Sequence, residues 1–250
     1  MLLGVFGGVY GALFSKLNYR WSRNVRNKTW LKTYPVAEVV LVCRSVNAVR
    51  LTCVIEQALA VQVTFVTTIF CFVNPFIRMG GTELVYNLFV ECHTGLPDRH
   101  SGLCVLDPPT QAWPVIRTVF TALVVKAALT IVTFGIKVPA GIFIPTLGVG
   151  ACAGRIVGIL VKYAQWRWPN APVFAMCNGD LDCVIPGLYA MVGAAAALSG
   201  VTRTTVSLAV IMFELTDTLT YAVPVMLAVL VAKTVADALE PKGIYDLVIE

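Results

Sequence analysis

Apolar stretches separated by short polar ones dominate this chain. A helix that crosses a bilayer needs about 20 mainly apolar residues. Two of the stretches are shorter than that, and short or interrupted membrane segments are typical of transporters, in which non-helical backbone lines a cavity. The pattern therefore predicts an all-α polytopic membrane protein with broken helices. The predicted segments are approximately residues 1–18, 36–73, 113–136, 142–164, 187–201, 206–215 and 221–239, the fifth and sixth being the short ones.

The amino-acid composition agrees with this pattern. Hydrophobic residues make up 58% of the 250 residues and charged residues 13%, whereas soluble domains carry about 25% charged residues. So few charges cannot cover a water-facing surface, so lipid must solvate much of the chain. The same composition excludes intrinsic disorder and argues against nucleic acid as a partner.

The net charge of +5 is concentrated between the first two apolar stretches. No acidic residue occurs before Glu38, so the positive-inside rule places this predicted loop in the cytoplasm. The alternative is a solvated basic loop that carries no information on topology. The basic residues are Lys16, Arg20, Arg23, Arg26, Lys28 and Lys32.

Two later polar loops, residues 74–112 and 165–186, each contain a pair of cysteines. With the basic loop in the cytoplasm, these loops face the lumen or the exterior, where disulfides persist. We therefore predict a disulfide in each loop, and the alternative is four free thiols. The cysteines are Cys92 and Cys104 in the first loop and Cys177 and Cys183 in the second.

A break between two apolar stretches carries the most informative chemistry. Gly135, Pro139, Gly141 and Pro145 interrupt the helical pattern there,. Backbone N–H groups without partners in lipid cost several kcal/mol each, so something must accept their hydrogen bonds. An anion at the N-terminus of the following helix accepts them, helped by the helix dipole. The alternative is a proline-kinked helix that binds no ligand.

Other residues are predicted to serve packing. Small residues four positions apart predict close helix contacts at Gly150 and Gly154, at Gly193 and Ala197, and at Ala196 and Gly200,. Charges at membrane depth are candidates for function by default. Three such charged residues are weaker candidates for function than the residues of the break, because Arg155 and Glu214 are expected to pair or to reach the interface. They are Lys126, Arg155 and Glu214.

Four segments of the chain carry a family resemblance. They are Gly141-Ile-Phe-Ile-Pro145, Gly150-Ala-Cys-Ala-Gly154-Arg155, the run 186–216 and Gly243-Ile-Tyr245. Together they resemble the CLC family of chloride channels and chloride/proton exchangers, and the resemblance covers nearly the whole chain. It implies the second inverted repeat of the CLC chloride channel fold. Residues 134–145 and 182–216 are most similar to the intracellular, exchanger-type eukaryotic branch.

The resemblance also implies a chloride site in the middle of the membrane. In the family, backbone amides of the segment that matches Gly141, Ile142, Phe143 and Pro145 hold the ion. A tyrosine hydroxyl that matches Tyr245 completes the inner side, since it donates a hydrogen bond without a net charge. The alternative is that Tyr245 is an aromatic residue of the membrane interface.

The implied function is that of a voltage-gated chloride channel or a chloride/proton antiporter. The full-length protein is expected to be a homodimer whose interface includes residues 206–215 and 221–239. The expected location is an endosomal, Golgi or vacuolar membrane, with the plasma membrane as the alternative. We expect no enzyme activity, cofactor or metal site, because His93 and His100 lie in a polar loop and no catalytic motif occurs at membrane depth,.

The chain also departs from the family pattern. Residues 1–250 are expected to be a partial membrane domain, without the first repeat and the cytoplasmic CBS domains. Residues 43–62 are expected to be a non-native insertion, because their removal joins residues 36–42 and 63–73 into one span of about bilayer thickness,. The alternative function is therefore a truncated, non-transporting membrane fragment that at most associates with full-length subunits.

Overall fold

A computed structural model describes residues 1–28, 75–90, 108–134, 141–168, 184–216, 221–241 and 243–244. Within these residues every regular element is an α-helix, which confirms the predicted all-α class. The helices are α1 (Leu2–Lys28), α4 (Pro75–Arg78), α5 (Gly81–Phe89), α6 (Pro108–Phe134), α7 (Phe143–Arg167), α8 (Pro186–Thr202), α9 (Val206–Thr216) and α10 (Ala222–Leu239).

Three of the described helices are long and apolar enough to cross a membrane. They are Ala112–Ile131 within α6, the whole of α7 and the whole of α10. Helices α8 and α9 have only 17 and 11 residues. The two segments predicted to be too short for an upright crossing are therefore short in the structure.

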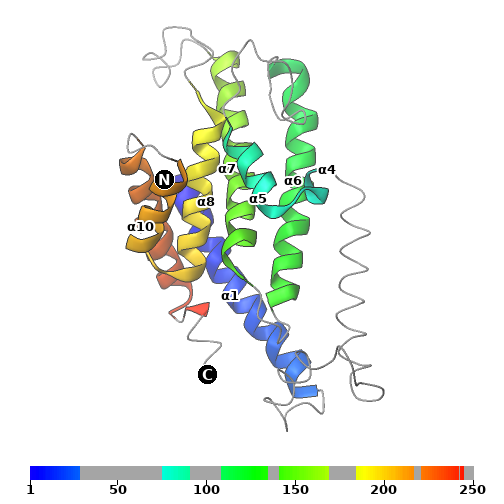
Figure 1. The fold of residues 1–250 in the computed structure, drawn as a ribbon, viewed down its shortest axis with the longest axis vertical. Helices are drawn as coiled ribbons and strands as arrows, with labels where there is room; N and C mark the ends of the chain where they lie inside the picture. The colour runs from blue at the N-terminus through cyan, green and yellow to red at the C-terminus, as the bar shows by residue number, and fades with distance from the viewer. Residues whose placement is uncertain are drawn as a thin grey trace.

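Helices α7 and α8 lie side by side in the centre of the bundle, between α6 and α10 (Figure 1). Glycine allows their backbones to approach closely. A Cβ atom on Gly150 would lie 2.5 Å from the carbonyl oxygen of Gly193, and one on Gly154 would overlap the carbonyl oxygen of Tyr189. The close contacts predicted from the small-residue spacing are thus present.

Helix α1 packs against both α8 and α10. Gly7 and Gly11 face α8, where Cβ atoms would overlap the backbone at Ala196 and Gly200. Gly8 meets α10 in the same way. The predicted pair Ala196 and Gly200 therefore contacts Gly7 and Gly11 of α1. Helices α1, α8 and α10 pack together through close backbone contacts.

The first helix is longer than predicted. We expected it to end near residue 18, but α1 continues to Lys28, so the basic residues from Lys16 to Lys28 belong to a helix and not to a loop. Neither glycine nor proline occurs between residues 12 and 34, so nothing ends the helix where the apolar pattern ends. Among the described helices, α1 lies outside the three that are apolar enough to span a membrane.

Different helix ends lie at the two ends of the bundle. The basic C-terminal end of α1 lies at the lower end in Figure 1, whereas α7 ends and α8 begins at the upper end. The connection between α7 and α8, which contains Cys177 and Cys183, therefore starts and finishes opposite the basic end of α1. Cys177 and Cys183 themselves lie outside the described residues, so the side on which they lie stays a prediction,.

Candidate functional site

The predicted break between α6 and α7 is described only at its end, where Gly141 and Ile142 precede the helix. Helix α6 ends at Phe134 and α7 begins at Phe143, while residues 135–140 lie outside the described residues. Ile142 is the N-cap of α7, and no side chain caps this helix end. The first N–H groups of a helix have no partner within the helix. The positive end of this 25-residue helix is therefore free of side-chain caps, as an anion site requires,.

One detail of the predicted break is wrong. Pro145 does not interrupt a helix but lies in the first turn of α7. Proline fits there because the N–H group that it lacks would have had no partner within the helix. The backbone donors that remain at this end are therefore the N–H groups of Ile142, Phe143 and Ile144.

Thr146 fixes the first turn of α7 from within. Its hydroxyl lies 2.6 Å from the carbonyl oxygen of Ile142 and 3.0 Å from that of Phe143. The Thr146 side chain is fully buried. Because the hydroxyl and the helix together engage these carbonyl groups, the first turn is held rigid while its N–H groups point out of the helix end.

The surroundings of this helix end are asymmetric. Ile142 is buried, whereas Gly141 and Ile144 are exposed and Phe143 is intermediate. A Cβ atom placed on Gly141 would meet no other atom within 4 Å. Among the described residues, the N-terminus of α7 is therefore packed at Ile142 and exposed at Gly141 and Ile144.

Ile142 and Ile244 lie in the same buried cluster, although they are far apart in the sequence. Their side chains are 7% and 1% exposed. Ile244 immediately precedes Tyr245 in the sequence, so the described chain reaches the cluster of Ile142 one residue before Tyr245. Tyr245 itself lies outside the described residues, and its role stays a prediction. The cluster, called here the Ile142 cluster, consists of Tyr10, Phe14, Ile142, Val149, Ala197, Val201 and Ile244.

Tyr10 is a polar member of this cluster that sequence analysis missed. Its side chain is 8% exposed, and its ring stacks on that of Phe6 and lies tilted against that of Phe14. Its hydroxyl is buried and has no hydrogen-bond partner among the described residues. The polar hydroxyl in an otherwise apolar run of α1 was the available signal, but only the fold reveals that it lies in the cluster of Ile142.

The three charged residues identified from the sequence differ in how far they are buried. Arg155 is 2% exposed, and its Nη1 donates to the carbonyl oxygens of Leu88 and Val90 at 3.0 and 3.2 Å. Of the two outcomes expected for Arg155, pairing or reaching the interface, the structure shows that it finds partners inside the protein, because the C-terminal carbonyl groups of α5 offer it acceptors,. Glu214 is exposed and Lys126 is half-buried.

The remaining predicted residues are not brought together by the described structure. Cys92, Cys104, Cys177 and Cys183 lie outside the described residues, as does the suspected insertion at 43–62. Within the described part of the chain, no group of histidine, cysteine and acidic residues could hold a metal ion.

The chain matches a known protein family over most of its length. Residues 1–237 match the family model for voltage-gated chloride channels. Among curated proteins, it is 41% identical to H(+)/Cl(-) exchange transporter 5 of Oryctolagus cuniculus over 266 residues, which cover 98% of this chain and 29% of the rabbit protein. It is 42% identical to the Homo sapiens transporter of that name, with the same coverage of both proteins.

A third relative and a solved structure agree with these matches. H(+)/Cl(-) exchange transporter 3 of Homo sapiens is 40% identical over 98% of this chain and 29% of its own length. The crystal structure of a eukaryotic CLC transporter matches 99% of this chain and 34% of its own, with a TM-score of 0.59 and 25% identity. The predicted CLC fold is thus confirmed, and the chain spans about a third or less of the length of these relatives.

Proposed function

The chain belongs to the voltage-gated chloride channel family, and we propose that it supplies the chloride-binding part of a chloride/proton antiporter. The relatives from rabbit and human are named as exchangers of protons and chloride, which supports antiport over a channel. The observation that carries the proposal is the joint burial of Ile142 and Ile244. It brings the free amides of α7 and the residue before Tyr245 to one end of the bundle.

We propose that chloride accepts hydrogen bonds from the amides at Ile142 and Phe143 and from the hydroxyl of Tyr245. None of the seven residues of the Ile142 cluster carries a charge. Backbone dipoles and a neutral hydroxyl attract an anion only through partial charges. Such a site binds chloride strongly enough for entry and weakly enough for exit, which a fixed full charge would prevent.

The proposed membrane location and dimeric state rest on the family and on the surface of the described helices. The protein is an integral membrane protein, and we propose an endosomal, Golgi or vacuolar membrane for it. We propose a homodimer that pairs through α9 and α10, because both carry exposed apolar side chains, among them Val206, Val210 and Val223,. We propose a transporter that needs neither a cofactor nor a metal and has no enzyme activity.

A backbone substitution tests the anion site most specifically. Residues 1–250 would replace the matching segment of the rabbit exchanger, and the chimaera would be produced with the α-hydroxy analogue of phenylalanine at Phe143. This change replaces one N–H by an ester oxygen and keeps the side chain. Hydrogen bonds to charged groups contribute about 1.5–3 kcal/mol, so chloride affinity should fall by roughly ten- to a hundredfold.

A matched control uses the same analogue at Phe213, whose N–H lies inside α9. That ester should lower stability slightly and leave chloride affinity, measured by calorimetry in a chloride-free starting buffer, unchanged. Equal chloride affinities for the Phe143 ester and the unmodified chimaera would remove the start of α7 from the site.

A further inference from the structure

Arg203 adopts a backbone conformation that normally favours glycine. It is the C-cap of α8, with φ 59° and ψ 9°, and its N–H donates to the carbonyl oxygen of Ser199 at 2.8 Å. Among the described residues other than glycine, Arg203 alone has a positive φ. Because this left-handed conformation is sterically unfavourable for a residue with a Cβ atom, glycine is usual at such a helix end. The side chain of Arg203 must therefore contribute something that glycine could not.

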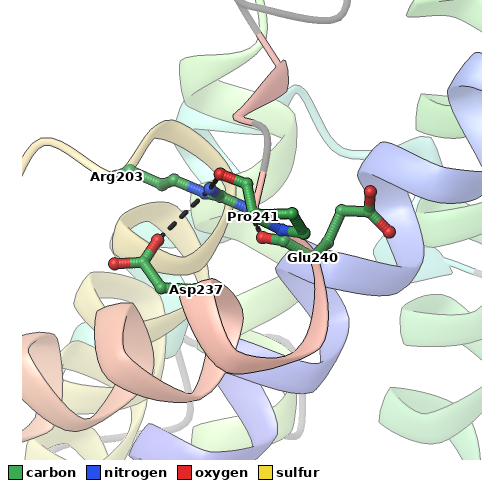
Figure 2. A network of polar contacts seen from close by, with 4 residues as sticks. All are labelled: Arg203, Asp237, Glu240 and Pro241. Carbon is green, nitrogen blue, oxygen red and sulfur yellow. Dashed lines mark hydrogen bonds and ion pairs between the residues drawn. The ribbon is translucent and has the colours of Figure 1, made fainter.

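The guanidinium of Arg203 joins the end of α8 to the end of α10. Its Nη1 donates to the carbonyl oxygen of Pro241 at 2.7 Å and lies 3.2 Å from Oδ1 of Asp237. Its Nη2 donates to the carbonyl oxygen of Glu240. Figure 2 shows the guanidinium between these three residues, while the Glu240 carboxylate points away from it. One side chain thus holds the last turn of α10 and the two residues that follow.

The position of these contacts matters because the chain changes direction there. Glu240 is the C-cap of α10 and has an extended backbone, with φ −143° and ψ 115°. The last carbonyl groups of a helix have no donors within the helix, and a cation at that end is favoured by the helix dipole. The Arg203 guanidinium satisfies both needs and so fixes where α10 ends.

The segment that leaves this point enters the candidate site. Gly243 and Ile244 are buried, and Ile244 belongs to the Ile142 cluster. Asp237, Glu240 and Pro241 thus immediately precede the segment that packs beside the start of α7 and leads to Tyr245.

We propose that Arg203 is a positioning residue for the anion site. By holding the carbonyl groups of Glu240 and Pro241, it sets the path of the chain through Ile244 to Tyr245. This inference rests on the proposed function, in which the Tyr245 hydroxyl binds chloride. Arg203 does not contact the anion and acts only through the segment that it anchors.

Two variants of the chimaera test this role. Arg203→Gly removes the guanidinium and relieves the backbone strain, so the fold should persist. Arg203→Lys keeps a positive charge but lacks the planar fork of two nitrogens that reaches Pro241 and Glu240 separately,. Chloride affinity should fall by about two- to tenfold in Arg203→Gly, because the Tyr245 hydroxyl is displaced and not removed, so that only part of a hydrogen bond to chloride is lost. The fall should be smaller in Arg203→Lys.

A double-variant experiment separates positioning from a general structural effect. If Arg203 acts through Tyr245, then Arg203→Gly should cause no further loss of chloride affinity when Tyr245→Phe is already present. A purely structural role would weaken chloride binding equally in both backgrounds. Glu240→Gln is the matched control, because Arg203 binds only the main-chain oxygen of Glu240, and its affinity should equal that of the unchanged chimaera.

A spectroscopic measurement reports on the position of Tyr245 without chloride. With 3-fluorotyrosine at position 245, the ¹⁹F resonance should shift or broaden in Arg203→Gly and should stay unchanged in Glu240→Gln. An unchanged resonance together with unchanged chloride affinity in Arg203→Gly would overturn the inference, as would losses that add fully in the double variant. If Tyr245→Phe alone has no effect on affinity, the proposed chloride site is wrong, and the ¹⁹F comparison still decides whether Arg203 holds this segment.

Discussion

The guanidinium of Arg155 donates a hydrogen bond to the carbonyl oxygen of Leu88, 3.0 Å away. Arg155 lies within the membrane-spanning helix α7, and Leu88 lies in the last turn of the short helix α5. A second bond from the same nitrogen reaches Val90. The buried arginine therefore supplies donors to carbonyl groups at the C-terminal end of α5, where a helix has no donors of its own.

Replacing Arg155 by methionine should release α5 from α7. Methionine fills a similar volume but offers no donor, so the Leu88 and Val90 carbonyl groups would lose a charged partner. Hydrogen bonds of this kind contribute about 1.5–3 kcal/mol, and the unfolding temperature should fall. Hydrogen exchange should increase most in residues 81–90. Arg167→Met, at the exposed end of the same helix, is the control, and similar exchange in both variants would contradict this role.

Gly154→Ala should destabilise the contact between α7 and α8. The added methyl group would overlap the carbonyl oxygen of Tyr189, which belongs to the backbone and cannot rotate away. Overpacking of this kind costs about 1–3 kcal/mol. The unfolding temperature of the purified chimaera measures the effect. Gly148→Ala in the same helix, where the nearest atom to an added Cβ would be in the Val85 side chain at 3.9 Å, should not lower that temperature. An equally small effect at Gly154 would refute the close contact.

Tyr10→Phe should raise stability. The Tyr10 hydroxyl is buried without a hydrogen-bond partner among the described residues, and leaving such a group unsatisfied costs about 1–3 kcal/mol. Removing it should therefore raise the unfolding temperature. Tyr19→Phe in the same helix is the control, because Tyr19 is exposed and water satisfies its hydroxyl. A lower unfolding temperature for Tyr10→Phe than for the unchanged protein would show that this hydroxyl has a partner.

The cysteine pairs test the predicted topology. Cys92 with Cys104 and Cys177 with Cys183 should be disulfide-bonded if their loops face an oxidising compartment. Peptide mass mapping without reduction should find two linked pairs, and Cys152, which is buried and free in the structure, should be recovered as a thiol. Alkylation of all four loop cysteines would argue against both the disulfides and the orientation.

The sequence predicted the helices well where apolar periodicity ends at glycine or proline. Helix α7 begins directly after Gly141 and Ile142, and an interruption at this point was expected from Gly141. The end of α1 was predicted wrongly, because its apolar pattern stops about ten residues before the helix does,. Hydropathy marks where lipid contact ends, whereas helix length depends on residues that can break the backbone.

The residues that support the candidate site could be predicted only in part. The motif around Phe143 is local, so the sequence alone pointed to the uncapped helix end. Thr146, Tyr10 and Arg203 act through contacts with backbone or with other helices, and no spacing pattern identifies such partners. Arg155 was noticed as a buried charge, but its acceptors lie on α5, which only the fold brings beside α7.

Coupled transport by the chimaera tests the proposed function most directly. Vesicles containing the purified chimaera would be given a chloride gradient, and proton movement would be followed with a pH-sensitive dye. We predict that chloride drives protons in the opposite direction, as in vesicles with the unmodified rabbit exchanger, and that the ester at Phe143 reduces both fluxes together. A folded, dimeric chimaera that moves neither ion, as expected of a non-transporting fragment, would contradict the proposal, and so would chloride flux without proton movement.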